Sequence, residues 1–123
     1  MRYMLSFFQP DSEYQRRTDP KTKDAYLAAW MAYTEAVFAT GMVVAGDGLM
    51  PPDAGASIRI RDGKRQVQDG PYPDTKEHLA GYFILDVPNQ EIALEWAAKA
   101  PATLCGTTQV RAVMDRPPQM RKD

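Results

Sequence analysis

The most regular pattern along the chain is an alternation of side chains between two faces, which is typical of β-strands. Residues 2–8 (RYMLSFF) and 81–87 (GYFILDV) show it most clearly, and each is largely apolar on its second face as well. Shorter strands are predicted at 42–46 (MVVAG) and 107–113 (TTQVRAV). The pattern therefore predicts four strands that are separated by longer segments of chain.

Two of those intervening segments show the three-to-four-residue spacing of apolar positions that marks an amphipathic helix. In the first, Asp19 is the predicted cap, Pro20 takes the first helical position and Gly41 ends the helix. In the second, Asn89 is the predicted cap of residues 90–100. The first helix has an aromatic-rich face, which we interpret as core packing rather than as a cofactor site.

A β-hairpin is predicted between the two halves of the chain. Residues 57–61 (SIRIR) alternate isoleucine with arginine, and Asp62-Gly63 supplies a tight turn into residues 64–68 (KRQVQ). The basic side chains of the hairpin are Arg59, Arg61, Lys64 and Arg65. They could meet an anion, but we interpret them as a solvated charged face.

The order of the predicted elements is β-α-β, a hairpin insertion, and then β-α-β. This is the element order of a ferredoxin-like α+β sandwich, in which two helices cover one face of an antiparallel sheet. The 123 residues suffice for one such domain, predicted at 1–114 and followed by a loose C-terminal tail at 115–123.

The two strongest strands also carry information about assembly. If both helices cover one face of the sheet, the other face should be polar wherever it meets water. Residues 3–8 and 82–87 are instead apolar on both faces. A second copy of the chain, packed sheet to sheet across a two-fold axis, is the simplest cover, so we expect a homodimer.

Charge and composition exclude several classes of partner. The chain has 15 basic and 16 acidic residues, a formal net charge of −1 that argues against nucleic acid and anionic membranes as partners. No segment approaches the ~20 apolar residues of a membrane span, and no signal-peptide core is evident.

Cys105 is the only cysteine and cannot form an internal disulfide. We expect a cytoplasmic protein.

The sequence lacks the common motifs for cofactors and metals. Residues 46–51 (GDGLMP) begin like a dinucleotide-binding fingerprint, but they lack its third glycine and lie in a proline-containing loop. One histidine and one cysteine cannot make a conventional zinc site. We therefore predict neither a cofactor nor a metal.

Residues 68–82 (QDGPYPDTKEHLAGY) combine turn formers, acids, a lysine and the only histidine. Asp69-Gly70-Pro71 can form a tight turn that leaves the hairpin. Asp74 can then cap a helical turn that contains Glu77. From residue chemistry alone, a self-capped loop without a ligand explains the segment better than a binding site does.

The same segment carries a resemblance to a known family. The run DGPYPDTKEHLAGYFILDV, followed by ALEWAAKAP, resembles the DGPFAETKE signature and flanking segments of the YCII-related, or DGPF-domain, family. The resemblance extends over residues 1 to about 115. Tyr72 and Pro73 stand where Phe and Ala are common in that family. His78 stands where Gln is usual, and Ala80 stands at a position that is often Gly.

The resemblance implies a dimeric α+β barrel built from ferredoxin-like subunits, with pockets between the helices and the sheet or near the dimer interface. Proteins of that superfamily include small isomerases, monooxygenases and a dehydrochlorinase. In the enzyme-like branch, a histidine on the first helix pairs with an aspartate in acid/base chemistry. The equivalent position here falls near Ala29 or Trp30, so this pair does not carry over.

Our leading hypothesis is a dimeric small-molecule-binding protein or an enzyme with acid/base chemistry. The resemblance makes residues 69–82 one wall of its pocket. The predicted ligand-binding residues are Tyr72, Thr75, Lys76, Glu77 and Tyr82, and the predicted catalytic residues are His78 and Asp69.

Two alternatives to that hypothesis remain open. Members of the family occur beside or fused to extracytoplasmic-function sigma factors, which would make the segment a docking surface for a protein partner rather than for DNA. The segment could also be purely structural and brace the barrel.

Overall fold

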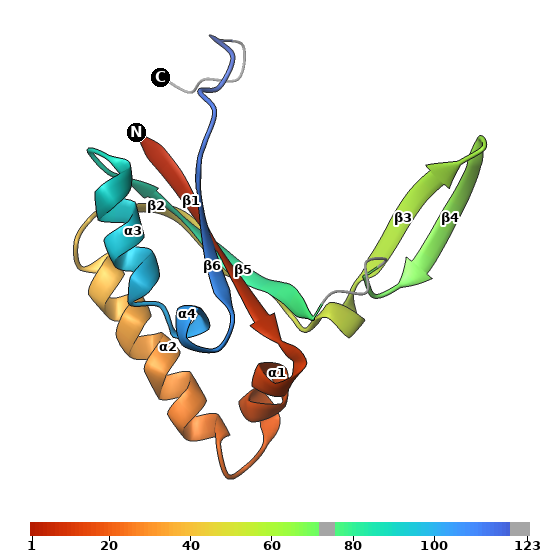
Figure 1. Ribbon diagram of the computed structural model, residues 1–123, viewed down its shortest axis with the longest axis horizontal. Helices are drawn as coiled ribbons and strands as arrows, with labels where there is room; N and C mark the ends of the chain where they lie inside the picture. Colours follow the sequence, from red (N-terminus) through yellow and green to blue (C-terminus); the bar gives the residue numbers. More distant parts are fainter. Residues whose placement is uncertain (72–75, 119–123) are drawn as a thin grey trace.

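The computed structural model describes residues 1–71 and 76–118 of the chain (Figure 1). Its main sheet has four strands in the order β2-β5-β1-β6. The strands are β1 (Arg2–Pro10), β2 (Val43–Gly48), β5 (Glu77–Asp86) and β6 (Thr107–Ala112). Each neighbouring pair is antiparallel, as the ferredoxin-like element order requires.

The helices are α1 (Asp11–Thr18), α2 (Lys23–Phe38), α3 (Gln90–Ala98) and α4 (Pro101–Cys105), with a short 3₁₀ turn, η1 (Pro52–Ala54). The two longest, α2 and α3, lie side by side over one face of the sheet, and α1 and α4 sit near one end of it (Figure 1). This confirms the α+β class predicted from the sequence. None of the helices in the described part of the chain is long and apolar enough to cross a membrane.

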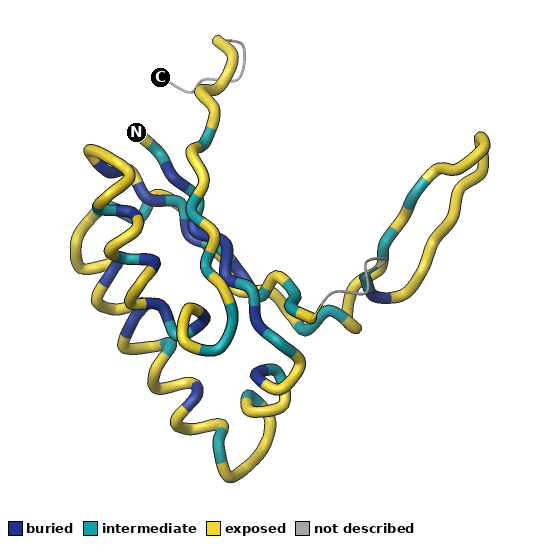
Figure 2. The backbone as a smooth tube through the Cα atoms, in the orientation of Figure 1, coloured by how far each residue is buried: buried dark blue, intermediate teal, exposed yellow. Residues whose placement is uncertain are grey.

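The core lies between the sheet and the two long helices, where Figure 2 shows the buried positions. Every second residue of β1 and β5 points into it: Tyr3, Leu5, Phe7, Phe83 and Leu85 are all buried. Tyr33 and Val37 of α2 and Ala93 and Ala97 of α3 close the core from the helix side. The alternation predicted for these strands is confirmed.

The segment after β1 corrects one expectation. The sequence predicts no element between the strand at 2–8 and Asp19, but residues 11–18 form α1, with acids in its first turn and Arg16 and Arg17 in its last, which suits the helix dipole. Asp19 therefore follows α1 instead of capping α2, and its carboxylate accepts from the backbone N–H of Lys21 at 2.9 Å. By contrast, the Asn89 cap of α3 is confirmed, since its Oδ1 accepts from Ile92 N at 3.1 Å.

The predicted hairpin is an arm that projects from the body (Figure 1). It consists of β3 (Ala56–Arg61) and β4 (Lys64–Asp69). Asp62 and Gly63 both have positive φ, 54° and 72°, as a type I′ turn requires. The arm is a separate two-stranded sheet, and most of its side chains are exposed.

One irregularity shapes the end of the sheet next to α1. The register between β1 and β5 shifts between Phe7 and Phe8, so that Phe7 pairs with Gly81 but Gln9 pairs with His78. Paired residues of antiparallel strands point to the same face. Alternation along β1 already places Gln9 on the same face as Phe7, and the extra residue in β5, Ala80, brings His78 opposite Gln9 and so to the helix side of the sheet, beside α1.

Candidate functional site

A cavity of about 500 Å³ lies between α1 and α2 on one side and β1, β5 and the end of β2 on the other; we call it the helix-side cavity. Its aromatic lining consists of Phe7, Tyr14, Tyr26, Trp30, Phe38 and Phe83. Its polar lining includes Gln9, Arg17 and Thr34. Volume and lining are those of a small-molecule site, mostly apolar with a few polar groups.

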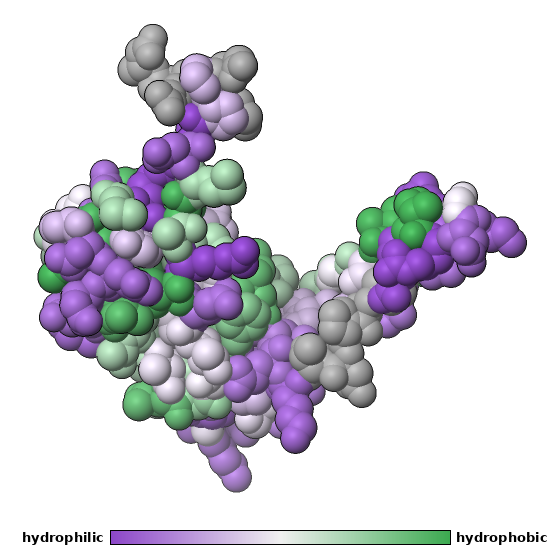
Figure 3. Space-filling model, turned by 45° about the horizontal axis from the view of Figure 1, so that its top comes forward, coloured by the Kyte–Doolittle hydropathy of each residue, from purple (hydrophilic) through white to green (hydrophobic). Residues whose placement is uncertain are grey.

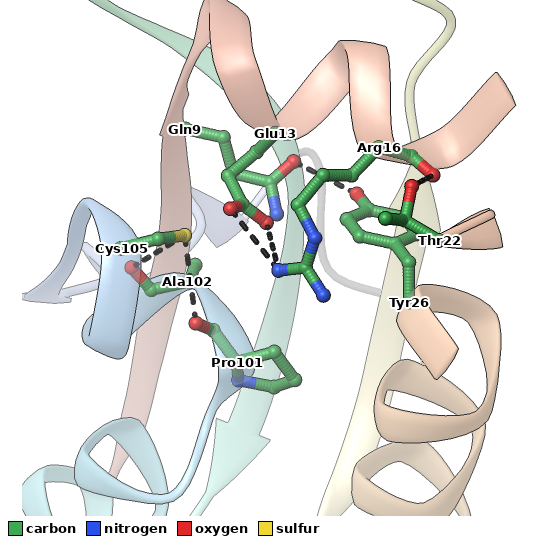
Figure 4. A network of polar contacts seen from close by, with 8 residues as sticks. All are labelled: Gln9, Glu13, Arg16, Thr22, Tyr26, Pro101, Ala102 and Cys105. Carbon is green, nitrogen blue, oxygen red and sulfur yellow. Dashed lines mark hydrogen bonds and ion pairs between the residues drawn. The ribbon is translucent and has the colours of Figure 1, made fainter. Parts of the chain in front are cut away.

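Gln9 is fully buried at the wall of this cavity. The Tyr26 hydroxyl donates to Gln9 Oε1 at 3.0 Å, as Figure 4 shows. With its oxygen held in this way, the amide nitrogen of Gln9 has no hydrogen-bond partner among the described residues. An unmatched buried donor of this kind destabilises a fold by about 1–3 kcal/mol.

Trp30 brings a second unmatched donor to the same cavity. Its indole Nε1 is buried and also has no partner within the described part of the chain. The indole ring packs edge-to-face on Phe7, with centroids 5.1 Å apart, and this contact fixes its orientation. Gln9 and Trp30, which both line this aromatic cavity, therefore each carry a buried N–H donor without an acceptor among the described residues.

Several charged groups lie around these donors. Arg17 lines the cavity, and its guanidinium donates to the Leu49 carbonyl at 3.4 Å. Asp47 also lines it, but its carboxylate accepts from the Tyr82 hydroxyl at 2.9 Å, on the sheet face away from the helices. Glu13, which appears next to Gln9 in Figure 4, is paired through both oxygens with Arg16 at 3.2 Å.

A second cavity, of about 520 Å³, lies beyond α1; we call it the loop-side cavity. It is lined by Asp11, Tyr14, Gln15, Pro51, Pro52, Asp53, Asp69, Gly70, Pro71 and His78. His78 Nε2 is 3.7 Å from Asp11 Oδ1, which is within ion-pair distance for a protonated imidazole but longer than a hydrogen bond. No group of three or more metal-ligating side chains converges within the described residues.

Tyr14 stands between the two cavities and lines both. Its hydroxyl donates to the backbone carbonyl of His78 at 3.1 Å. Burial, with the neighbouring Tyr26 and Asp11 as further causes, raises the pKa of Tyr14 to about 12. The phenol therefore stays neutral at physiological pH and acts as a fixed donor.

The structure places the predicted site residues in several different locations. Asp69 and His78 lie in the loop-side cavity. Lys76 is exposed and Glu77 is half-buried at the start of β5, where it pairs with Pro10; both lie outside the lining of the two cavities. Glu77 therefore begins a strand, not a helical turn.

The remaining three are Tyr82, Tyr72 and Thr75. Tyr82 points to the opposite sheet face, where its hydrogen bond to Asp47 raises the pKa of the phenol. Tyr72 and Thr75 lie outside the described residues, as does the predicted cap Asp74. Of the predicted ligand-binding residues that the structure describes, Lys76, Glu77 and Tyr82, none lines the helix-side cavity.

Sequence reasoning missed the residues of the helix-side cavity, although one signal was present. Tyr3, Leu5, Phe7 and Gln9 share one face of β1, so a glutamine continues a buried apolar row. A polar side chain at such a position needs partners, and its presence could have marked a site. Trp30 gave no such signal, because an aromatic residue on a helix is explained by core packing alone.

Cys105 is half-buried beside α1. Burial, together with the nearby Glu13 carboxylate, raises the pKa of its thiol to about 11. The thiol is therefore protonated at neutral pH and is a poor nucleophile.

Comparisons with known proteins agree with this architecture. The family model for the YCII-related domain matches residues 1–117. An uncharacterised protein of Rhizobium meliloti (strain 1021) is 39% identical over 49 residues, a match that spans 40% of this chain and 40% of the relative.

Among solved structures, 5-chloro-2-hydroxyhydroquinone dehydrochlorinase from Burkholderia phenoliruptrix, in complex with 2,5-dihydroxybenzoquinone, is similar. The TM-score is 0.53 at 16% identity, and the alignment covers 93% of this chain and 94% of that one. At this level of identity, the likeness shows a shared fold.

Proposed function

This chain belongs to the YCII-related domain family, and on that premise we propose that it binds a small molecule in the helix-side cavity. The observation that carries the proposal is the pair of buried, unmatched donors, Gln9 Nε2 and Trp30 Nε1, in one aromatic-lined cavity. A ligand that accepts from both would remove the energetic penalty that they impose on the empty protein.

The surroundings of the donors support binding. Contacts between aromatic rings fix the walls of the cavity. Phe7 packs on Trp30 and also on Phe83, and the ring centroids of Phe7 and Phe83 are 5.3 Å apart. A site that is formed before the ligand arrives loses little conformational entropy on binding. The structural relative with the dehydrochlorinase name was solved with a small cyclic molecule bound, which shows that this fold can hold one.

Filling the cavity tests this proposal. Leu27 lines the cavity and is half-exposed, so the larger side chain of Leu27→Trp should block it. Leu94→Trp is the matched control, because Leu94 is similarly exposed on α3 and does not line either cavity. The probe is N-phenyl-1-naphthylamine, a neutral dye that fluoresces in apolar sites. We expect strong fluorescence with the wild type and Leu94→Trp, and a loss of at least about tenfold in affinity with Leu27→Trp. Equal affinity in all three proteins would refute binding at this site.

Acid/base catalysis in the loop-side cavity is a second candidate function. It is favoured by the His78–Asp11 pair and by Asp69 in the same cavity. An imidazole oriented by a carboxylate can accept a proton from a substrate and return it. In this proposal His78 is the base, Asp11 orients it, and Asp69 contacts the substrate.

The compound named for the structural relative, 5-chloro-2-hydroxyhydroquinone, is the first substrate to test. We expect chloride release by the wild type, its loss in His78→Ala, and about tenfold slower release in Asp11→Asn. Asp53→Asn, which alters another carboxylate of the cavity, should release chloride at the wild-type rate. Undiminished turnover by His78→Ala would eliminate its role as the base.

Assembly as a homodimer is also part of the proposed function. Met4, Phe8, Tyr82 and Ile84 are only half-buried on the sheet face away from α2 and α3, and no described helix covers that face (Figure 1). The arm adds the exposed apolar residues Ile58, Ile60 and Val67, part of the green patch on the arm in Figure 3. In a two-fold dimer each subunit contributes the same surfaces to the interface. A second copy could therefore bury both the sheet face and the apolar residues of the arm.

Native mass spectrometry and size-exclusion chromatography test the dimer. Ile84→Asp places a charge at the centre of the proposed interface and should give a monomer, whereas Leu94→Asp on α3 should leave the dimer intact. A wild-type monomer would contradict the proposal and leave the apolar face without a cover.

A further inference from the structure

The chemical class of the ligand can be argued further, and the argument rests on the binding function proposed for the helix-side cavity. We infer that this cavity takes a planar aromatic molecule that carries an anionic oxygen, with that oxygen accepting hydrogen bonds from Gln9 Nε2 and Trp30 Nε1. Three features support this class: the kind of polar group that is unmatched, the charge at the lining, and the shape of the walls.

The unmatched groups are both donors. Tyr26 donates to Gln9 Oε1 at 3.0 Å, which occupies the acceptor of that amide and leaves its nitrogen as a buried donor without a partner among the described residues. The indole of Trp30 has only a donor to offer. A ligand that brings only donors, such as an ammonium group, would leave both nitrogens unsatisfied, whereas an oxygen with several lone pairs can satisfy both.

The charge at the lining favours an anion. Arg17 is the basic residue that lines the cavity, and its hydrogen bond to the Leu49 carbonyl leaves further guanidinium N–H groups to interact with a ligand. Asp47 is turned to the other sheet face by Tyr82, and the charge of Glu13 is balanced by Arg16. Hydrogen bonds to an ionised oxygen are roughly twice as strong as those to a neutral one.

The walls favour a planar ring over a bulky aliphatic body. Trp30 and Phe83 both stand edge-to-face against Phe7, at interplanar angles of 72° and 87°, and Phe38 stands at 89° to Phe83. Rings held at such angles present both faces and edges, and an aromatic ligand can stack on them or meet them edge-on. Aromatic faces alone would also suit a cation, but the cationic Arg17 and the two unmatched donors oppose one.

Side-chain N–H signals in a ¹⁵N-correlated NMR spectrum report on this inference directly. The wild-type protein is titrated with four probes of similar size: benzoate, benzyl alcohol, benzylamine and cyclohexanecarboxylate. We expect benzoate to shift the Trp30 indole and Gln9 amide signals saturably, with an affinity about 10- to 100-fold higher than that of benzyl alcohol. Trp96 does not line the cavity, and its indole signal is the internal control.

Paired substitutions then assign the effect to the donors. Gln9→Met with Tyr26→Phe removes the amide and its hydroxyl partner together at similar volume, and should weaken benzoate about 10- to 100-fold while leaving the neutral naphthylamine dye bound. Gln9→Glu replaces a donor by a carboxylate and should abolish benzoate binding. Retention of dye binding shows that these variants are folded.

The outcomes separate the two proposals. If the dye binds but benzoate does not, or binds no better than benzyl alcohol or benzylamine, the class of ligand is wrong and binding in the cavity stands. If cyclohexanecarboxylate equals benzoate, the requirement for an aromatic ring is wrong. If Leu27→Trp fails to displace the dye, the proposed function itself is wrong.

Discussion

The two cavities differ in how they are built and in how visible they are in the sequence. The loop-side cavity gathers ionisable side chains from a loop, a helix terminus and a strand end, and two of its carboxylates, those of Asp11 and Asp69, are on exposed residues. The helix-side cavity is lined by the inner faces of regular elements, and its key polar groups, Gln9 Nε2 and Trp30 Nε1, are removed from water. The first stands out as a motif, and the second is hidden in ordinary amphipathic patterns.

The difference shows that the segment richest in functional side chains is not where the structure leaves hydrogen-bonding groups without partners. A polar, turn-rich segment satisfies its hydrogen bonds with water and with itself, so its richness in functional side chains does not by itself require a ligand. A buried donor without a partner does require an explanation, because the fold is less stable for it. The helix-side cavity therefore has the better claim to be a binding site.

The largest expected effect comes from glycines in the two regions. A Cβ at Gly81, which lines the helix-side cavity, would lie 2.7 Å from the Asp47 backbone oxygen and push β2 from β5. Gly81→Ala should therefore lower the free energy of unfolding by about 3 kcal/mol. A Cβ at Gly70 in the loop-side cavity would contact only Pro52 O, at 3.9 Å. The strain of a φ of +78° on an alanine should still lower the free energy of unfolding of Gly70→Ala by about 1 kcal/mol. Urea denaturation of both variants measures the difference, and similar losses would mean that the two regions are equally constrained.

The next effect concerns the empty protein. Gln9→Met with Tyr26→Phe removes the unmatched amide nitrogen and both halves of its hydrogen-bonded pair, so it should raise the free energy of unfolding by about 1 kcal/mol. Gln66→Met on the exposed arm is the control and should change it by less than about 0.5 kcal/mol. A destabilised double variant in urea denaturation would show that the Gln9 amide is a structural group instead of a site for a ligand.

A smaller effect should appear at alkaline pH through Tyr14, the residue that both cavities share. Its folded pKa of about 12 lies above the ordinary value of 10.0, so the neutral phenol favours the folded state. That stabilisation is complete below pH 10 and is lost as the pH rises from 10 to 12. In thermal melts, Tyr14→Phe should therefore lose less stability than the wild type across this window. Identical pH profiles would show that Tyr14 is not buried between the cavities.

The smallest effects are expected in the loop segment. Asp69→Asn and Lys76→Ala alter exposed side chains, and each should change the free energy of unfolding by less than about 0.5 kcal/mol. Differential scanning calorimetry checks this. A large loss of stability in either variant, without an effect on ligands, would favour the alternative in which the segment braces the fold. The alternative of a docking surface for a protein partner stays a prediction.

Much of the fold could be predicted from local patterns. Strict alternation in residues 81–87 placed Phe83 and Leu85 on one face, which the structure shows to be buried, and Asp62-Gly63 specified the hairpin turn. These predictions hold because side-chain direction in a strand and positive φ in a tight turn are set by neighbours in sequence. Helix α1 was missed because eight mostly polar residues carry little periodic signal, and its stability depends on packing.

The sequence by itself determined the order of the elements, the faces of the strands and the residues rich in chemistry around Asp69 and His78. Only the tertiary structure decided which polar atoms lack partners. Gln9 of β1 meets Tyr26 only because α2 packs beside that strand, and the indole nitrogen of Trp30 is buried in the same region. Whether a buried donor is satisfied depends on atoms distant in the chain, and no local pattern of residues encodes that geometry.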